Sequence, residues 1–413
     1  MHRIFLSLAI LIGCIAPILA ADWTVVKHDG RDYLTMDNIA EFYSLSRVRR
    51  RDKEASASSG VRSIRTAVGS PDFFINNLKF ILSYPAIEHE GHVCISRMDL
   101  VKLIEPVMRP SKIKNAEPID TVVLDAGHGG HDSGAMSLYG PEKQFALDVA
   151  VRARALLIAS GLKVVLTRRD DTFISLDERV RIANQYKRAI FIAVHFNSGG
   201  WGTGVEAFTL APRGVPSMMA DGPSVSDLNE CRGNARDAEN IALATATHAA
   251  LVVKTHMFDR GLKRARFVVI RDIAIPGVLI EGGFQTNPYD SKMIATPAYR
   301  QLLAQAILQA VDNYRRAVGA KAAPSSSPNA SPSAGPTVSH TEDEPKTTKP
   351  KPAPSGKGQK PKPTKPEPIA PPKPEMPPEP KPEAVEPPKP VEPPKPDTPP
   401  VPTPEPAEPP KPE

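Results

Sequence analysis

Three short runs of apolar, largely β-branched residues constrain the fold of this chain more than any other feature. They span 119–124, 189–194 and 277–280. Runs of this length and composition predict buried strands. Longer segments with apolar residues at three- and four-residue spacing predict helices over 142–160, 237–254 and 297–318. Such strands and helices predict an α/β unit, an open mixed twisted sheet with helices on both faces.

Shorter signals complete this unit, which we expect to span residues 117–318. Further strands are predicted over 162–167, 205–210 and 267–270. Ser175 and Glu178 have the spacing of a capping box and predict a helix that runs to about Tyr186. Residues 211–233 contain Pro212, Pro216 and Pro223 and predict a long loop.

The first twenty residues have the layout of a secretory signal peptide. Arg3 precedes an apolar run from Ile4 to Ile15, and small residues around Ala20 suggest cleavage there. A competing interpretation is a lipoprotein box at residues 11–14, which would leave a lipid on Cys14. We favour simple secretion, because the residues after Cys14 stay apolar. The protein is then expected in the periplasm or cell wall, without a stable membrane span.

Residues 22–108 predict a small α+β domain with an internal repeat. His28-Asp29-Gly30 and His89-Glu90-Gly91 each predict a turn that is followed by a strand, a Thr or Ser cap and a helix. The pattern resembles β-rich stalk domains of the copper-amine-oxidase N-terminal type, which would imply a stalk or wall-binding role. Residues 47–63 are expected to form an exposed loop or a helix.

Residues 320–413 hold most of the 46 prolines, separated by Lys and Glu, and predict a disordered, extended tail. A wall tether and a solubilising tail are equally compatible with it. The net charge of +6 is scattered, so we expect no nucleic-acid partner. The three cysteines, Cys14, Cys94 and Cys231, offer neither a disulfide framework nor a cysteine zinc pattern.

Four ionisable residues lie where the predicted elements of the α/β unit begin or end. His128 stands in a glycine-rich loop after the first strand, Glu142 opens a helix, and His195 and Glu281 each follow a buried strand. Taken singly, each has an ordinary structural explanation, such as a favourable helix dipole for Glu142. Together they converge on one rim of the sheet. Three such residues can hold a catalytic Zn²⁺, and the fourth can serve as general base.

Five motifs carry a family resemblance over residues 121–314. They are LDAGHGG, GPEK, VHFN, DRGLK and IEGGFQTN, in that order. The chain resembles the zinc-dependent N-acetylmuramoyl-L-alanine amidases of the amidase-3 family, which cut the bond between sugar and stem peptide in peptidoglycan. The resemblance implies that His128, Glu142 and His195 bind zinc and that Glu281 is the catalytic carboxylate. Ala126, Ala193 and Gln144 depart from the family pattern without removing any of these residues.

The resemblance and the expected chemistry also suggest roles around the site. Asn197 and Arg260 are expected to bind substrate, Arg260 through the carboxylates of the peptide, although Arg260-Gly261 also suits a structural turn. Asp125 is expected to orient a ligand histidine. Residues 211–233 could form a gate over the zinc, although a surface loop suits their polar composition better. An activator protein remains open as a partner. The alternatives are a zinc peptidase acting on another stem-peptide bond and a wall-binding scaffold without activity.

Overall fold

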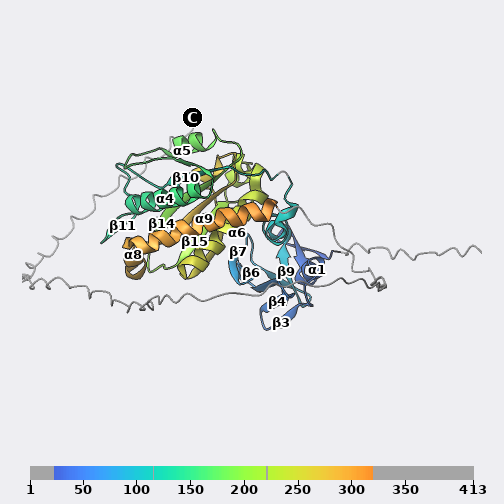
Figure 1. Ribbon diagram of the computed structural model, residues 1–413. Coiled ribbons are helices and arrows are strands. Elements are labelled where there is room, and N and C mark those ends of the chain that lie inside the picture. Colours follow the sequence, from blue (N-terminus) through green and yellow to red (C-terminus); the bar gives the residue numbers. More distant parts are fainter. Residues whose placement is uncertain (1–22, 115, 220–221, 320–413) are drawn as a thin grey trace, which may run out of the picture. The chain divides into compact units, whose positions relative to one another are not determined.

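The computed structural model describes residues 23–114, 116–219 and 222–319 (Figure 1). The predicted signal peptide, Cys14 and the Pro-rich tail lie outside these ranges. Within them, no helix is long and apolar enough to cross a membrane. Cys94 and Cys231 are both free thiols.

An 11-stranded mixed sheet forms the framework. Its strands, in spatial order, are β13 (Lys163–Leu166), β10 (Thr121–Ala126), β14 (Ala189–Asn197), β17 (Gly277–Phe284), β15 (Val205–Leu210), β16 (Asp259–Ala265), β7 (Leu78–Ile81), β6 (Asp72–Ile75), β5 (Ser63–Ala67), β4 (Glu54–Ser58) and β3 (Arg49–Arg51). Strands β13, β10, β14 and β17 are parallel, whereas β15 is antiparallel to β17. The carboxyl ends of β10, β14 and β17 therefore meet at one edge of the sheet.

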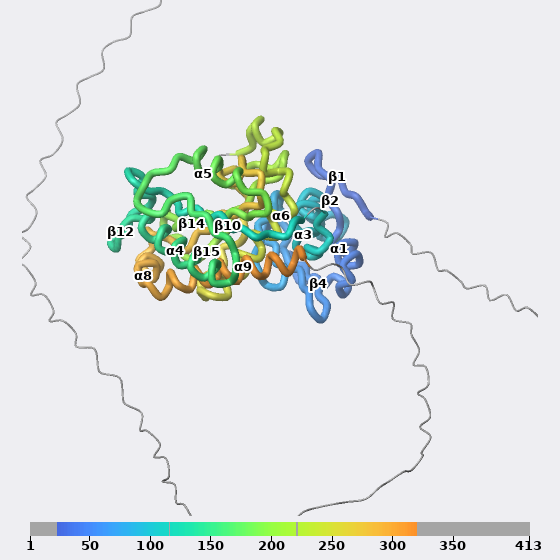
Figure 2. The backbone as a smooth tube through the Cα atoms, turned by 45° about the horizontal axis from the view of Figure 1, so that its top comes forward, coloured from blue at the N-terminus to red at the C-terminus, as the bar shows by residue number. Residues whose placement is uncertain are grey.

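Helices cover both faces of this sheet. Helices α4 (Glu142–Ala159), α6 (Asp237–Thr255) and α9 (Pro297–Gly319) pack together on one face (Figures 1 and 2). On the other face, α5 (Leu176–Ala183) packs with α7 (Val268–Arg271). Successive residues of β10 alternate between the two cores: Val122 and Leu124 belong to the first and Val123 to the second. Burial on both faces explains why the strands are continuously apolar, and the predicted α/β architecture is confirmed.

The structure adds to or departs from the expected elements at three places. Residues 267–270 were expected as a strand, but they contribute to α7, and the strand is β16, which lies earlier in the chain. A four-residue apolar run is compatible with both a strand and a buried helical turn. Helix α8 (Pro288–Ala295), which Asn287 caps through the backbone N–H groups of Tyr289 and Asp290, was not predicted. The predicted loop 211–233 contains the 3₁₀ turn η3 (Val225–Leu228) and the start of η4 (Arg232–Arg236).

The amino-terminal repeat is present as two related hairpins. They build a four-stranded sheet in the order β1 (Val25–His28), β2 (Arg31–Thr35), β9 (His92–Ser96) and β8 (Ile87–His89). Each turn has its two central residues at positive φ, Asp29 and Gly30 in one and Glu90 and Gly91 in the other. Thr35 then caps α1 (Met36–Phe42), and Ser96 caps α2 (Arg97–Asp99). The second copy continues through η1 (Leu100–Ile104), α3 (Glu105–Met108) and η2 (Pro110–Lys112).

Strands β3 to β7 continue the large sheet as an antiparallel meander. The expectation of a loop or helix over 47–63 is wrong, because β3 and β4 form a hairpin there. Strand β7 pairs in parallel with β16 through Phe80 and Leu262. The sheet that carries the site edge is therefore continuous with strands from the amino-terminal segment.

Candidate functional site

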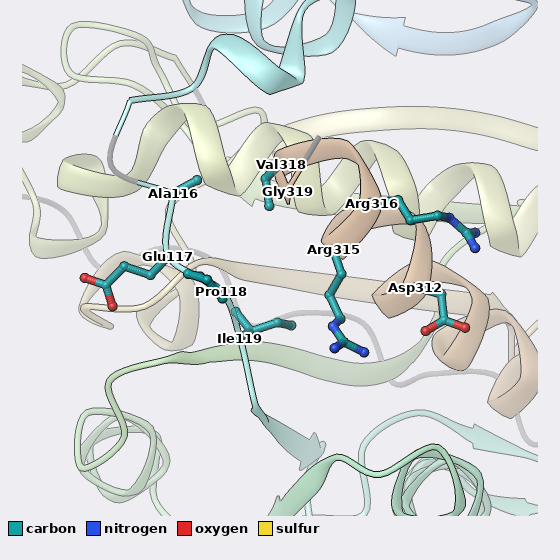
Figure 3. Close-up of a pocket in the computed structure, with 9 residues that line it drawn as sticks. All are labelled: Ala116, Glu117, Pro118, Ile119, Asp312, Arg315, Arg316, Val318 and Gly319. Carbon is teal, nitrogen blue, oxygen red and sulfur yellow. The ribbon is translucent and has the colours of Figure 1, made fainter. Parts of the chain in front are cut away.

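Two cavities of similar volume differ in their chemistry. One, of about 720 Å³, lies where residues 116–119 run beside the last turns of α9, lined by Arg315, Asp312 and their neighbours (Figure 3). None of the four predicted site residues lines this cavity. The other, of about 700 Å³, contains His128, His195 and Glu281 in its wall. We therefore place the functional site in the second cavity, which we call the cleft.

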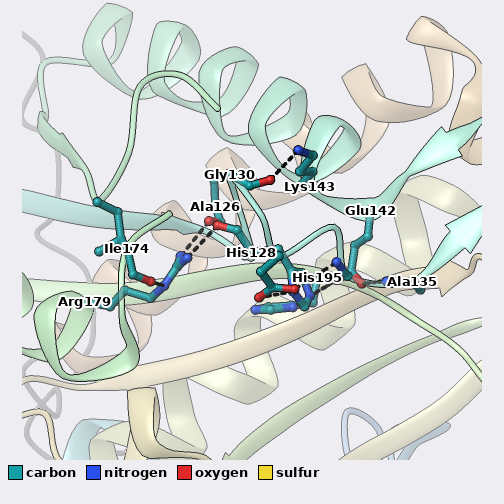
Figure 4. A network of polar contacts seen from close by, with 12 residues as sticks. Ala126, His128, Gly130, Ala135, Glu142, Lys143, Ile174, Arg179 and His195 are labelled. Atoms are coloured by element: carbon teal, nitrogen blue, oxygen red, sulfur yellow. Dashed lines mark hydrogen bonds and ion pairs between the residues drawn. The ribbon is translucent and has the colours of Figure 1, made fainter. Parts of the chain in front are cut away.

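His128, Glu142 and His195 meet at the carboxyl edge of the sheet (Figure 4). Each offers one ligand atom, and these atoms lie within 4.8 Å of one another. His128 follows β10, Glu142 begins α4 directly after the short β11–β12 hairpin (Met136–Ser137 and Gly140–Pro141), and His195 lies in β14. Two imidazole nitrogens and a carboxylate oxygen form a donor set that suits a divalent metal.

The backbone around His128 is shaped to bring these side chains together. His128 itself has φ 60°, a left-handed conformation that non-glycine residues rarely adopt. A Cβ atom at Gly127 would lie 2.3 Å from the His195 ring, and one at Gly134 would lie 2.6 Å from Glu142 Oε2. The glycines of this loop therefore leave the space that the ligand side chains occupy.

Glu142 is the central group of the cluster. Its Oε1 lies 3.0 Å from His128 Nε2 and 3.0 Å from His195 Nδ1. Phe196 N–H also donates to Oε1 and Ala135 N–H to Oε2, which fixes the carboxylate in place. Burial alone would raise the pKa of Glu142, but the contacts with His128 and His195 hold it well below its ordinary range. Glu142 therefore presents a charged carboxylate, as a metal ligand must.

His128 has a carboxylate partner that the sequence analysis missed. Asp132 Oδ2 lies 2.9 Å from His128 Nδ1, on the ring edge opposite the nitrogen that faces Glu142. Burial lowers the pKa of His128, but the contacts with Glu142 and Asp132 outweigh it, and the pKa is raised. The available signal was the four-residue spacing inside the glycine loop. A carboxylate on the far nitrogen orients a metal-binding imidazole.

Asp125 lies beside the cleft and is paired differently from our expectation. Its Oδ1 accepts hydrogen bonds from Thr167 Oγ1 and Arg179 Nη1, both at 2.6 Å. Arg179 also donates to the main-chain oxygens of Ala126 and His128, so this buried pair braces the loop that carries His128 (Figure 4). The contact with a histidine that we expected of Asp125 is made by Asp132.

Glu281 lies directly opposite His195 in the β14–β17 ladder. Its side chain lines the cleft, and its Oε2 is buried without a hydrogen-bond partner among the described residues. Burial raises the pKa of Glu281 well above its ordinary value, with further contributions from the charges of Glu142 and Glu206 and an opposing one from Lys263. A carboxyl group in such surroundings is suited to accept and return a proton.

Asn197 and Arg260 also come together, around a carboxylate that the sequence analysis did not single out. Asn197 Nδ2 donates to Glu206 Oε1 at 2.7 Å, and Arg260 Nε donates to Glu206 Oε2 at 2.8 Å. Glu206 is 2% exposed and lies opposite Glu281 in the β15–β17 ladder. The sequence signal for it is a Glu at the second position of a strand in which only one other residue, Thr209, is polar.

The rest of the cleft is largely apolar. Its walls come from the segment before α5, from α7 and from β17, and include Phe173, Ile174, Leu176, Phe267, Val268, Val269 and Leu279. No described residue of 211–233 lines it. Arg266, which itself lines the cleft, holds that segment: its Nη2 donates to the main-chain oxygens of Pro212, Val215 and Asp227. The described part of this segment therefore fits a surface loop better than a gate.

Comparison with known proteins decides the family. The profile described as N-acetylmuramoyl-L-alanine amidase (Amidase_3) matches residues 122–313. The N-acetylmuramoyl-L-alanine amidase AmiA of Escherichia coli is 32% identical over 244 residues, which cover 53% of this chain and 84% of that protein. This chain belongs to the amidase-3 family.

Other N-acetylmuramoyl-L-alanine amidases match a similar share of the chain. The N-acetylmuramoyl-L-alanine amidase LytC of Bacillus subtilis is 32% identical over 206 residues, covering 50% of this chain and 38% of its own length. The solved catalytic domain of CwlV, an N-acetylmuramoyl-L-alanine amidase from Bacillus (Paenibacillus) polymyxa, is 30% identical, with a TM-score of 0.40, covering 48% of this chain and 98% of that domain. The amidase-3 match contains His128, Glu142, His195 and Glu281, and it does not include the residues before 122.

Proposed function

We propose that this amidase hydrolyses the amide bond between N-acetylmuramic acid and L-alanine of peptidoglycan, with Zn²⁺ held by His128, Glu142 and His195 and with Glu281 as general base. The observation that carries this proposal is the cluster of three ligand atoms within 4.8 Å, beside the carboxyl group of Glu281, whose Oε2 is buried and has no hydrogen-bond partner among the described residues. Membership of the amidase-3 family supplies the reaction.

Hydrogen bonds orient the side chains that would hold the metal. Asp132 accepts a hydrogen bond from His128 Nδ1 when that nitrogen carries the proton, which leaves Nε2 free to bind a cation. The N–H groups of Phe196 and Ala135 hold the two oxygens of Glu142. Zinc in such a site supplies Lewis acidity, which polarises a carbonyl group and lowers the pKa of water.

Glu281 is assigned the proton transfers. In its ionised form it accepts a proton from the attacking water, and it then delivers that proton to the leaving amine of L-alanine. The apolar walls around it, including Leu279 and Val269, limit the access of bulk water to the reacting groups. Asn197 and Arg260 are assigned to substrate binding at the neighbouring rim.

We further propose that the protein is secreted through its amino-terminal signal and acts in the periplasm or cell wall. Lipid attachment at Cys14 is the alternative to a free secreted form. The division into a stalk or wall-binding domain over 22–108, a catalytic domain over 117–318 and a disordered tail over 320–413 stays a prediction, as does an activator protein.

Metal removal and reloading tests the proposal. Purified protein is treated with a chelator, dialysed and assayed for release of dye-labelled fragments from peptidoglycan, then reloaded with Zn²⁺. We expect activity to disappear with the bound metal and to return at one Zn²⁺ per chain, whereas His195→Ala should stay inactive. Full activity in protein shown by elemental analysis to be metal-free would overturn the assignment.

A further inference from the structure

Glu206 is a buried carboxylate beside the proposed general base. It is 2% exposed and lies on β15, antiparallel to β17 and directly opposite Glu281. Because directly opposed residues of a ladder point to the same face of the sheet, the row His195, Glu281 and Glu206 crosses three neighbouring strands. Glu206 therefore extends the row of metal ligand and base by one strand.

Three side chains, one from β14 and two from β16, donate hydrogen bonds to this carboxylate. Asn197 Nδ2 donates to Oε1 at 2.7 Å, while Arg260 Nε and Lys263 Nζ donate to Oε2 at 2.8 Å and 2.5 Å. A buried carboxylate is costly unless it is paired, and one cation is enough to neutralise it. The group that we call the Glu206 cluster, made of Glu206, Asn197, Arg260 and Lys263, thus contains one cation in excess of what a structural ion pair needs.

Arg260 is held with donors to spare. Its Nε is used by Glu206, and its guanidinium carbon lies 4.6 Å from the centre of the Phe284 ring. Within the described ranges these are its polar and ring contacts, and its side chain is 30% exposed. An arginine has five N–H donors, and its two terminal nitrogens can bind a carboxylate in a bidentate manner.

We propose that Glu206 is a positioning residue for the reaction. It holds Asn197 and Arg260 at the rim beside Glu281, so that the terminal guanidinium nitrogens of Arg260 bind a carboxylate of the stem peptide. This inference rests on the proposed amidase function and adds the anionic group by which the peptide side of the substrate is recognised. Lys263 neutralises Glu206 at the same oxygen, so that the positive charge of Arg260 is left to attract an anionic group.

The test compares two soluble muramyl-peptide substrates, one with free peptide carboxylates and one with the same carboxylates amidated. The zinc-loaded full-length protein should have a KM at least about tenfold lower for the free acid. Arg260→Gln and Glu206→Gln should each raise KM for the free acid about tenfold, with kcat reduced less. KM for the amidated substrate should change less than twofold in both variants.

The control is Asp237→Asn. Asp237 is also buried and pairs with Lys102 Nζ at 2.8 Å and Asn234 Nδ2 at 3.0 Å, a similar arrangement away from the cleft. The Asp237→Asn variant should leave both KM values unchanged. Thermal unfolding and zinc content are measured for every variant. Equal changes on both substrates would mean a structural role for Glu206 and would overturn the proposal, as would equal KM values in the wild type. A folded, zinc-loaded wild type that cleaves neither substrate would instead overturn the amidase function.

Should Glu206→Gln fail to fold, Arg260→Gln still decides the matter, because the Arg260 side chain is partly exposed and its loss leaves Lys263 paired with Glu206. Selective loss of the preference for the free acid in this variant supports the carboxylate subsite. An unchanged preference overturns it.

Discussion

His195 and Glu281 are direct partners on the neighbouring parallel strands β14 and β17. The main-chain register of the sheet therefore fixes a proposed metal ligand and the proposed general base side by side at one edge. His128 and Glu142 reach the same edge from the loop after β10 and from the start of α4. A site held by strands and a helix terminus keeps its geometry better than one carried on loops alone.

Glu281→Gln should abolish turnover and leave zinc bound. Loss of a general base typically reduces the rate by about 10²–10⁴-fold, and Glu281 is outside the three-ligand group. The measurements are fragment release from peptidoglycan and zinc content by elemental analysis. A near wild-type rate in this variant would show that another group takes the proton.

The same substitution should stabilise the metal-free protein, and increasingly so at higher pH. Burial raises the pKa of Glu281 in the folded state. The contribution of the protonated Glu281 to the free energy of unfolding is therefore fully present below the unfolded-state pKa of about 4.3, and it is lost as pH rises through the folded-state pKa. Gln does not ionise and should escape this loss. Thermal unfolding of both proteins with chelator from pH 5 to 8 measures the difference. If the Tm difference between Glu281→Gln and the wild type stayed constant or narrowed as pH rises, the raised pKa of Glu281 would be contradicted.

Asp132→Asn should weaken zinc binding about 10- to 100-fold, because its carboxylate orients His128. Asp171→Asn is the matched control, since Asp171 contacts the same loop through Gly130 N–H and Lys143 but touches neither histidine. Competition with a chromophoric chelator gives both affinities. Equal losses in the two variants would mean that the loop, rather than the histidine contact, sets the affinity.

A fragment of residues 112–319 should be less stable than one of residues 23–319. It lacks β7, which pairs with β16, and it leaves the buried Arg264 without the Lys102 main-chain oxygen that accepts from its Nη2 at 2.5 Å. Tyr84, whose hydroxyl donates to Gly214 O, is lost as well. We expect the loss to come mainly from apolar side chains, such as Leu262, that pack against the missing segment, at about 1.5–3 kcal/mol for each large side chain that becomes exposed. Equal unfolding temperatures for the two fragments would show that the shared sheet is dispensable.

The sequence predicted the parts of the site whose signals are local. His128, His195 and Glu281 each follow or end a buried apolar run, and Glu142 opens an amphipathic helix, so their convergence follows from the parallel strands. Asp132 and Glu206 were missed because their importance lies in their partners. Glu206 gains its partners from β14 and β16, and no pattern within residues 205–210 reveals them.

The errors in the fold have the same origin. Residues 267–270 are apolar enough for a strand, yet α7 uses Val269 and Ile270 to cover the face of the sheet. Residues 47–63 lack apolar periodicity, and β3 and β4 form there because the meander continues from β5. The pairing of β7 with β16 joins segments far apart in the chain, which no local signal could indicate.

The most direct test of the account is product analysis by mass spectrometry after the protein digests purified peptidoglycan, with and without a chelator. The account predicts free stem peptides that begin with the amino group of L-alanine, lost on chelation and restored by Zn²⁺. Shortened peptides that remain attached to the sugar would contradict it, because they would mean a peptidase acting on a different amide bond.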